Sequence, residues 1–150
     1  MWLRSPTAAT GYARPVTDPR GALHRLRDAA ASGALGALCE RYGVSLLTVF
    51  GSVLRPAGVP RDLDVAVRFK DENADVLGFL DELGVVADTT GLDLMNLDAA
   101  GPVARERALV GAELLVESAP ETFVRERLAA MMDRMDTDWL RRLNLRLMAR

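Results

Sequence analysis

The chain has 150 residues and a mass of 16.3 kDa, which is typical of one domain, and 49% hydrophobic residues suffice for one core. Its 19 basic and 21 acidic side chains give a net charge of −2, which argues against a protein that holds nucleic acid by charge alone. No apolar segment approaches the roughly 18–20 residues of a transmembrane helix, and the N-terminus does not resemble a secretory signal. We therefore expect a cytoplasmic protein with no membrane partner and no direct nucleic-acid binding.

Residue types limit the available chemistry further. Cys39 and His24 are the only cysteine and histidine, which excludes an intramolecular disulfide and a multi-histidine metal site. Catalysis is therefore expected to use carboxylates, hydroxyls, arginines or backbone groups. Cys39 is predicted to be a small buried hydrophobe and His24 an ordinary surface or half-buried residue.

The N-terminal part of the chain divides near residue 19. Residues 1–19 contain three of the seven prolines and little periodicity, which predicts a flexible arm before a domain at residues 20–150. Asp18 and Pro19 have the residue types of a helix cap and a first helical position. Apolar residues at helical spacing follow, with an interruption at Gly33, so this segment is either one kinked helix or two short ones.

Two β-rich segments come next. Residues 44–50 (VSLLTVF) have the length and composition of a buried strand. Residues 62–69 (DLDVAVRF) alternate between apolar and other side chains, which predicts a strand with one apolar face. Sequential strands with a short connection are usually neighbours, so we expect these two to lie side by side in one sheet.

The rest of the chain alternates between helical and β patterns. Asn73 is predicted to cap a helix that Gly84 ends, and Ser118 with Glu121 forms a capping-box pattern that opens the last helix. Between them we expect a strand, a short helix and a short strand, at residues 91–97, 102–110 and 112–116. Apolar residues at helical spacing in the last helix are predicted to face the core, an exposed partner groove being the alternative: Leu128, Met132, Met135, Trp139, Leu143 and Leu147. The element order indicates a mixed α/β (α+β) domain around a small sheet.

Three aspartates lie on predicted strands. Asp62 and Asp64 are two residues apart, so both project from one face of a strand, roughly 7 Å apart along the backbone. Paired carboxylates repel each other unless a cation or a proton lies between them, and Mg²⁺ suits such a pair because it binds carboxylates together with substrate phosphates and water. Asp93 can supply a third carboxylate if its strand is a neighbour. Each aspartate taken alone also fits a solvated strand edge.

Possible phosphate-binding groups precede the aspartate pair. Gly51 would allow a phosphate to approach the backbone, and Ser52 offers a hydroxyl and an N–H. Arg55 and Arg61, in the connecting loop, could add charge-assisted hydrogen bonds to a polyphosphate. A glycine and a serine after a strand also form an ordinary turn, so the order and spacing of the whole set carry the hypothesis.

The segment from Phe50 to Asp64 resembles the Gly-Ser…Asp-x-Asp signature of the DNA polymerase β-like nucleotidyltransferase superfamily. It looks most similar to the small minimal nucleotidyltransferase (MNT) proteins. Asp93 matches the family's third aspartate, and the last strand and helix are similar too, so the resemblance covers roughly residues 20–147. The loop between Ser52 and Asp62 is one residue shorter than is common in these proteins, and Arg61 stands where they often have serine or threonine.

The resemblance implies a polymerase β-like nucleotidyltransferase fold and a Mg²⁺-dependent transfer from ATP. Asp62, Asp64 and Asp93 would be the catalytic and metal-binding residues, and Gly51 with Ser52 would bind the departing phosphates. Almost no chain is left for an acceptor domain, and MNT proteins typically act as antitoxins that place AMP on a hydroxyl, typically of tyrosine, of a HEPN-domain toxin. We therefore predict an adenylyltransferase antitoxin that forms a hetero-oligomer with its toxin. The alternatives are a catalytically weak antitoxin that acts by binding, and an enzyme that modifies a small molecule such as an aminoglycoside.

Overall fold

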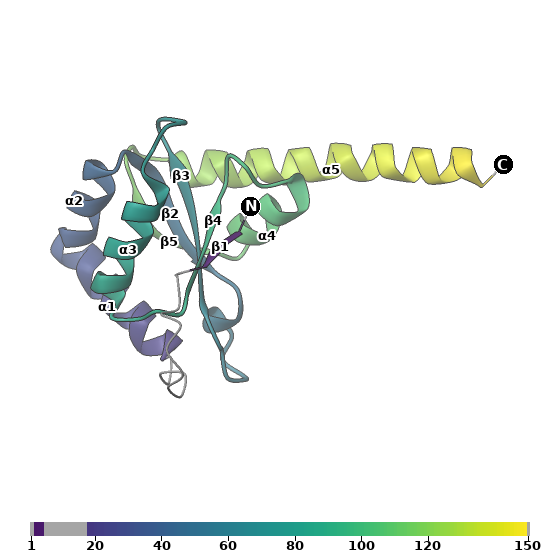
Figure 1. Cartoon of the computed structure of the whole chain (residues 1–150). Helices are drawn as coiled ribbons and strands as arrows, with labels where there is room; N and C mark the ends of the chain where they lie inside the picture. Colours follow the sequence, from purple (N-terminus) through teal and green to yellow (C-terminus); the bar gives the residue numbers. More distant parts are fainter. Residues whose placement is uncertain (1, 5–17, 150) are drawn as a thin grey trace.

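The computed structural model describes residues 2–4 and 18–149. In chain order the strands of this part are β1 (Trp2–Arg4), β2 (Val44–Phe50), β3 (Leu63–Phe69), β4 (Leu92–Asn96) and β5 (Glu113–Glu117). The helices are α1 (Pro19–Ser32), α2 (Ala34–Arg41), α3 (Val76–Ala87), α4 (Pro102–Leu109) and α5 (Thr122–Met148), and a 3₁₀ turn, η1, covers Ser52–Leu54. Figure 1 shows a mixed α/β body from which α5 projects.

One sheet organises the described residues. Its strand order is β1-β4-β3-β2-β5, and β3 and β4 pair in parallel while the other neighbours are antiparallel. The parallel pair requires a crossover, which α3 provides. The expected pairing of the first two predicted strands is confirmed, because β2 and β3 are adjacent.

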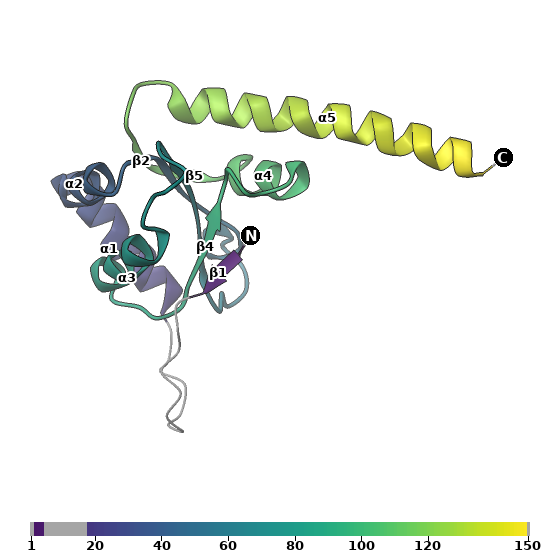
Figure 2. The ribbon, with the colours of Figure 1, turned by 45° about the horizontal axis from the view of Figure 1, so that its top comes forward.

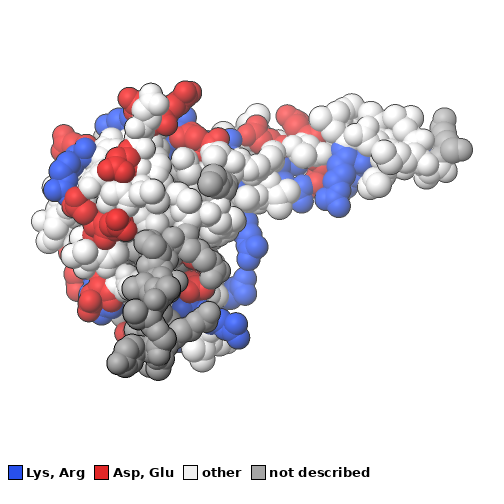
Figure 3. Space-filling view, in the orientation of Figure 1, with Lys and Arg blue, Asp and Glu red and all other residues white. Residues whose placement is uncertain are grey.

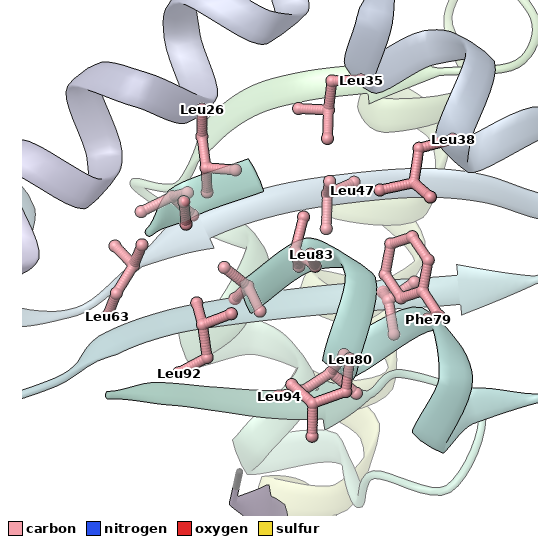
Figure 4. Close-up of a cluster of buried hydrophobic side chains, with 14 of the residues drawn as sticks. Leu26, Leu35, Leu38, Leu47, Leu63, Phe79, Leu80, Leu83, Leu92 and Leu94 are labelled. Carbon is pink, nitrogen blue, oxygen red and sulfur yellow. The ribbon is translucent and has the colours of Figure 1, made fainter. Parts of the chain in front are cut away.

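Apolar side chains fill both faces of the sheet. Alternation along β3 sends Leu63, Val65 and Val67 to a large cluster under α1–α3, and it sends Ala66 to a smaller cluster under α4 and α5. Figure 4 shows the larger cluster, and Figure 2 shows the two helical layers on either side of the sheet. Cys39 is buried in the larger cluster, as expected, and burial raises the pKa of its thiol to about 12.

The predicted start of the first helix is confirmed. The Asp18 side chain accepts a hydrogen bond from the Gly21 N–H (3.0 Å), and Pro19 lies in the first turn of α1. Gly33 has a φ of 85° and separates α1 from α2, so the segment is two helices. His24 lies on the surface of α1, where its side chain is 73% exposed.

Both predicted ends of α3 are wrong. Asp75, not Asn73, caps the helix, because its carboxylate accepts a hydrogen bond from the Gly78 N–H (2.9 Å). Gly84 does not end the helix, which continues to Ala87. The Thr89 N–H donates to the Gly84 carbonyl (3.1 Å). The returning backbone therefore packs on Gly84 at a distance that leaves little space for a side chain.

The predicted start of the last helix is also wrong. Ser118 is not its cap, because the Ser118 N–H donates to the Ser45 carbonyl (2.9 Å) and extends the sheet pairing. The helix begins at Thr122, and the Glu117 carboxylate accepts a hydrogen bond from the Phe123 N–H (3.0 Å) instead.

The N-terminal arm is described in part. Residues 2–4, which the sequence pattern assigns to a flexible arm, form the edge strand β1 against β4. The expectation for residues 1 and 5–17 lies outside the described residues.

The apolar stripe of α5 does not enter the core, contrary to its predicted burial. Its six members are all at least 39% exposed, because α5 contacts the body through another face. No helix in the described ranges is long and apolar enough to cross a membrane.

Candidate nucleotide and metal site

The site is built around Gly51, directly after β2 ends at Phe50. Gly51 has a φ of 84° and a ψ of −153°, a backbone region that is essentially restricted to glycine. A Cβ atom at Gly51 would also lie less than 3.0 Å from Oδ2 of Asp64. The residue is therefore glycine for two reasons, backbone conformation and the space taken by the Asp64 carboxylate.

Asp64 and Asp93 occupy matching positions on neighbouring strands. Antiparallel pairing aligns Phe50 with Asp64, and parallel pairing aligns Asp64 with Asp93. Their neighbours in the chain point into the larger cluster, so both aspartates lie on the opposite face of the sheet. Adjacent strands are about 4.8 Å apart, which brings the two carboxyl groups into one small region. Asp93 is only 8% exposed.

Asp62, unlike Asp64 and Asp93, has no strand pairing that fixes its position. It directly precedes β3, whereas the sequence pattern includes it in the strand, and it is half-buried. The Leu63 N–H donates to the Gly91 carbonyl (2.8 Å), so Asp62 lies beside the chain that leads into β4. Its role as a third acidic ligand beside Asp64 and Asp93 stays a prediction.

The acidic pair has the donor type that Mg²⁺ uses. Residues 2–4 and 18–149 contain no ready-made group of three or more histidine, cysteine or acidic side chains that could hold a metal ion. Mg²⁺, however, is commonly held by one or two carboxylates together with substrate phosphates and water. Asp64 and Asp93, aligned on adjacent strands, fit that requirement.

A pocket of about 460 Å³ opens next to Gly51. Its lining comes from the end of β2, from η1 and its following residue, and from the end of α4: Gly51, Leu54, Arg55, Glu106, Arg107, Val110 and Gly111. Gly51 joins this pocket to the acidic pair, since it also contacts Asp64. Of the four predicted nucleotide-binding residues, Gly51 and Arg55 line the pocket; Ser52 and Arg61 are not among its lining residues.

The charge of the pocket favours an anionic ligand. Arg55 and Arg107 contribute two exposed guanidinium groups, whereas the carboxylate of Glu106 is paired with Arg134 (3.2 Å). Figure 3 shows basic atoms in the region of the β2–β3 connection and α4. Guanidinium groups bind phosphate oxygens through charge-assisted hydrogen bonds, so phosphate is a suitable ligand class.

A side chain of α1, Arg20, holds the loop that carries Arg55. The guanidinium of Arg20 donates hydrogen bonds to the carbonyls of Arg55 (3.3 Å) and Gly58 (2.9 Å). This contact joins the N-terminal end of α1 to a loop more than thirty residues further along the chain. Arg20 is therefore a positioning residue for the predicted phosphate loop.

Arg107 is a site residue that the sequence pattern does not reveal. It lies more than fifty residues after Gly51, on a short helix with no recognisable motif. Only the packing of α4 on the sheet brings it to the pocket, and the sequence contains no signal for that packing.

Comparisons with known proteins place the fold. No protein-family model and no curated protein matches the chain. A solved toxin–antitoxin structure with AMP-PNP is 16% identical with a TM-score of 0.60, over 77% of this chain and 96% of that chain. A structure of a tri-AMPylated Shewanella oneidensis HEPN toxin in complex with MNT antitoxin is 15% identical with a TM-score of 0.59, over 83% of this chain and 99% of that chain. An MntA–HepT toxin–antitoxin structure is 14% identical with a TM-score of 0.58, over 85% of this chain and 99% of that chain.

These likenesses define the fold at two levels. The mixed sheet with helices on both faces is a nucleotidyltransferase fold, so the predicted fold class is confirmed. More narrowly, it is the fold of an MNT antitoxin that was solved in complex with a HEPN toxin, and of the MntA–HepT toxin–antitoxin structure.

Proposed function

We propose that this chain is an MNT antitoxin that transfers AMP from ATP to a hydroxyl group of a HEPN-domain toxin. The observation that carries the proposal is the alignment of Gly51, Asp64 and Asp93 across adjacent strands, beside a pocket that presents Arg55 and Arg107. The shared fold supports it, because one structural neighbour contains AMP-PNP and another contains an AMPylated HEPN toxin.

The proposed roles follow from charge. Asp64 and Asp93, with Asp62 beside them, would hold Mg²⁺, which when bound neutralises triphosphate charge and polarises the α-phosphate. The backbone N–H groups at Gly51 and Ser52 would bind the β- and γ-phosphates, and the guanidinium groups of the loop, on Arg55 and Arg61, would add charge-assisted hydrogen bonds.

The proposed transfer is an in-line displacement at the α-phosphorus. The acceptor oxygen forms a bond to the α-phosphorus while the bond from that phosphorus to the β-phosphate oxygen breaks. Asp93 accepts the proton of the acceptor hydroxyl, directly or through water, and pyrophosphate leaves with the electron pair of the broken bond.

The test is mass spectrometry of the product of the neighbouring gene after incubation with this chain, ATP and Mg²⁺. We expect a mass gain of one or more AMP groups with the wild-type chain and with Asp81→Asn, an aspartate on the exposed face of α3. Asp64→Asn is expected to abolish the gain. A stable complex without a mass gain would overturn AMP transfer and favour neutralisation by binding. A gain on an aminoglycoside but on no protein would favour the small-molecule alternative.

A further inference from the structure

The pocket beside Gly51 contains one acidic side chain among its described lining residues, that of Glu106. Glu106 lies in the last turn of α4, directly before Arg107. Its carboxylate can oppose the binding of a polyphosphate in two ways. It repels phosphate groups directly, and it can pair with the guanidinium of Arg107, which lines the same pocket. The charge that the pocket presents to a ligand therefore depends on what neutralises Glu106.

The last helix supplies the opposite charge. Nε of Arg134, on α5, lies 3.2 Å from Oε2 of Glu106. Arg105, the residue before Glu106, is engaged elsewhere, because it pairs with Glu126 and Asp133 at 3.4 Å each. Arg134 is therefore the basic side chain that holds Glu106.

The packing of α5 on the body fixes the position of Arg134. Ala130 lies one turn earlier on the same face of the helix and is fully buried in the smaller cluster. Figure 2 shows α4 and α5 side by side. The Arg134 side chain is only 23% exposed, and it also pairs with Asp138 one turn later. Arg134 is thus held at α4, unlike an exposed arginine whose ion pair contributes little.

We propose that Arg134 is a positioning residue for nucleotide binding. Its guanidinium pairs with the Glu106 carboxylate and keeps that charge from the phosphates of the ligand. Arg55 and Arg107 then remain available to bind those phosphates. The last helix thereby belongs to the nucleotide site, although none of its described residues lines the pocket. This role rests on the proposed nucleotide site and does not require AMP transfer, so a binding measurement tests it.

The effect is electrostatic and should grow with the charge of the ligand. ATP carries more negative charge than AMP, and its β- and γ-phosphates are the groups proposed to lie near Gly51 and Arg55. Arg134→Gln frees the carboxylate of Glu106. We expect this change to weaken ATP binding about three- to tenfold and AMP binding less than about twofold. A loss of packing alone would weaken the binding of both nucleotides alike.

The test is calorimetric titration of ATP and of AMP, with Mg²⁺, into four forms of the full chain. These are the wild type, Arg134→Gln, Glu106→Gln and the double variant. Glu106→Gln alone should bind ATP at least as tightly as the wild type, because it removes a negative charge from the pocket. The double variant should regain ATP affinity to within about twofold of the wild type, because it has no carboxylate for Arg134 to neutralise.

Two further variants control for the packing of α5. Asp138→Asn removes the other ion pair of Arg134 and leaves Glu106 paired, and Arg141→Gln removes an exposed guanidinium farther along the helix. Both should bind ATP like the wild type, and thermal unfolding checks that every variant is folded. Unchanged ATP affinity in Arg134→Gln, a double variant without rescue, or equal losses for ATP and AMP would overturn the role of Arg134. A wild-type chain that binds no ATP would overturn the nucleotide site itself, and this role with it.

Discussion

Replacing Gly51 with alanine tests whether the Asp64 carboxylate lies against the end of β2. The native φ of 84° and ψ of −153° cost a residue other than glycine about 1–3 kcal/mol. The new Cβ would also lie less than 3.0 Å from Oδ2 of Asp64, so that carboxylate must move. Together these effects are expected to lower the free energy of unfolding by about 2–4 kcal/mol.

Gly33→Ala is the matched control. Gly33 has nearly the same φ, 85°, but an added Cβ would meet nothing within 4 Å. Its cost is therefore backbone strain alone, about 1–2 kcal/mol. We expect Gly51→Ala to weaken ATP binding at least tenfold and Gly33→Ala to leave it unchanged, as measured by calorimetric titration with chemical denaturation for stability.

A double-mutant cycle separates the steric contact from the strain. In an Asp64→Ala background the carboxylate is gone, so Gly51→Ala should cost less unfolding free energy than it does in the wild type. Equal costs in both backgrounds, or a Gly51→Ala variant that binds ATP like the wild type, would refute the placement of Asp64.

Two further predictions concern charged side chains, one in the pocket and one in a surface ion pair. Arg107→Ala should weaken ATP binding about three- to tenfold, as measured by calorimetry, because one exposed charge-assisted contact is lost. An equal loss of affinity with Arg125→Ala, on α5, would contradict a specific role for Arg107. The hydrogen bond from Arg27 holds the pKa of Glu113 below its usual value, so this pair stabilises the fold above the unfolded pKa near 4.5. The stabilisation should disappear as pH falls through the lower folded pKa. Both side chains are about a third or more exposed, so Glu113→Gln should lower the free energy of unfolding by less than about 1 kcal/mol at pH 7 and not at all in strong acid. Denaturant unfolding at both pH values measures this difference. A loss of stability that persists in acid would contradict the prediction.

Local signals in the sequence predict much of this fold. The β2 segment is predicted at its observed bounds, and alternation along β3 correctly separates its two faces. Asp18 and Gly33 mark the first two helices because capping and a left-handed φ depend on a few adjacent residues. The order of the candidate site residues, from Gly51 to Asp93, likewise indicates the site, and the paired strands β3 and β4 bring Asp64 and Asp93 together.

Features that depend on tertiary packing escape the same reasoning. Ser118 matches a capping box, but its N–H is used by the sheet. The helix begins only after Glu121, and the Glu117 carboxylate accepts a hydrogen bond from the Phe123 N–H in its first turn. Arg107 reaches the pocket only through the docking of α4. The stripe around Trp139 has the periodicity of a core helix, and periodicity alone does not distinguish a face covered by the same chain from one left for another molecule.

Calorimetric titration of ATP with Mg²⁺ into three forms of the chain tests whether the acidic pair binds the metal and the nucleotide. These are the wild type, the Asp64→Asn, Asp93→Asn double variant, and the Asp81→Asn control. We expect metal-dependent binding that the control retains and that the double variant loses while remaining folded. Equal binding by the double variant and the wild type would place the nucleotide away from the acidic pair and contradict the proposed roles of Asp64 and Asp93.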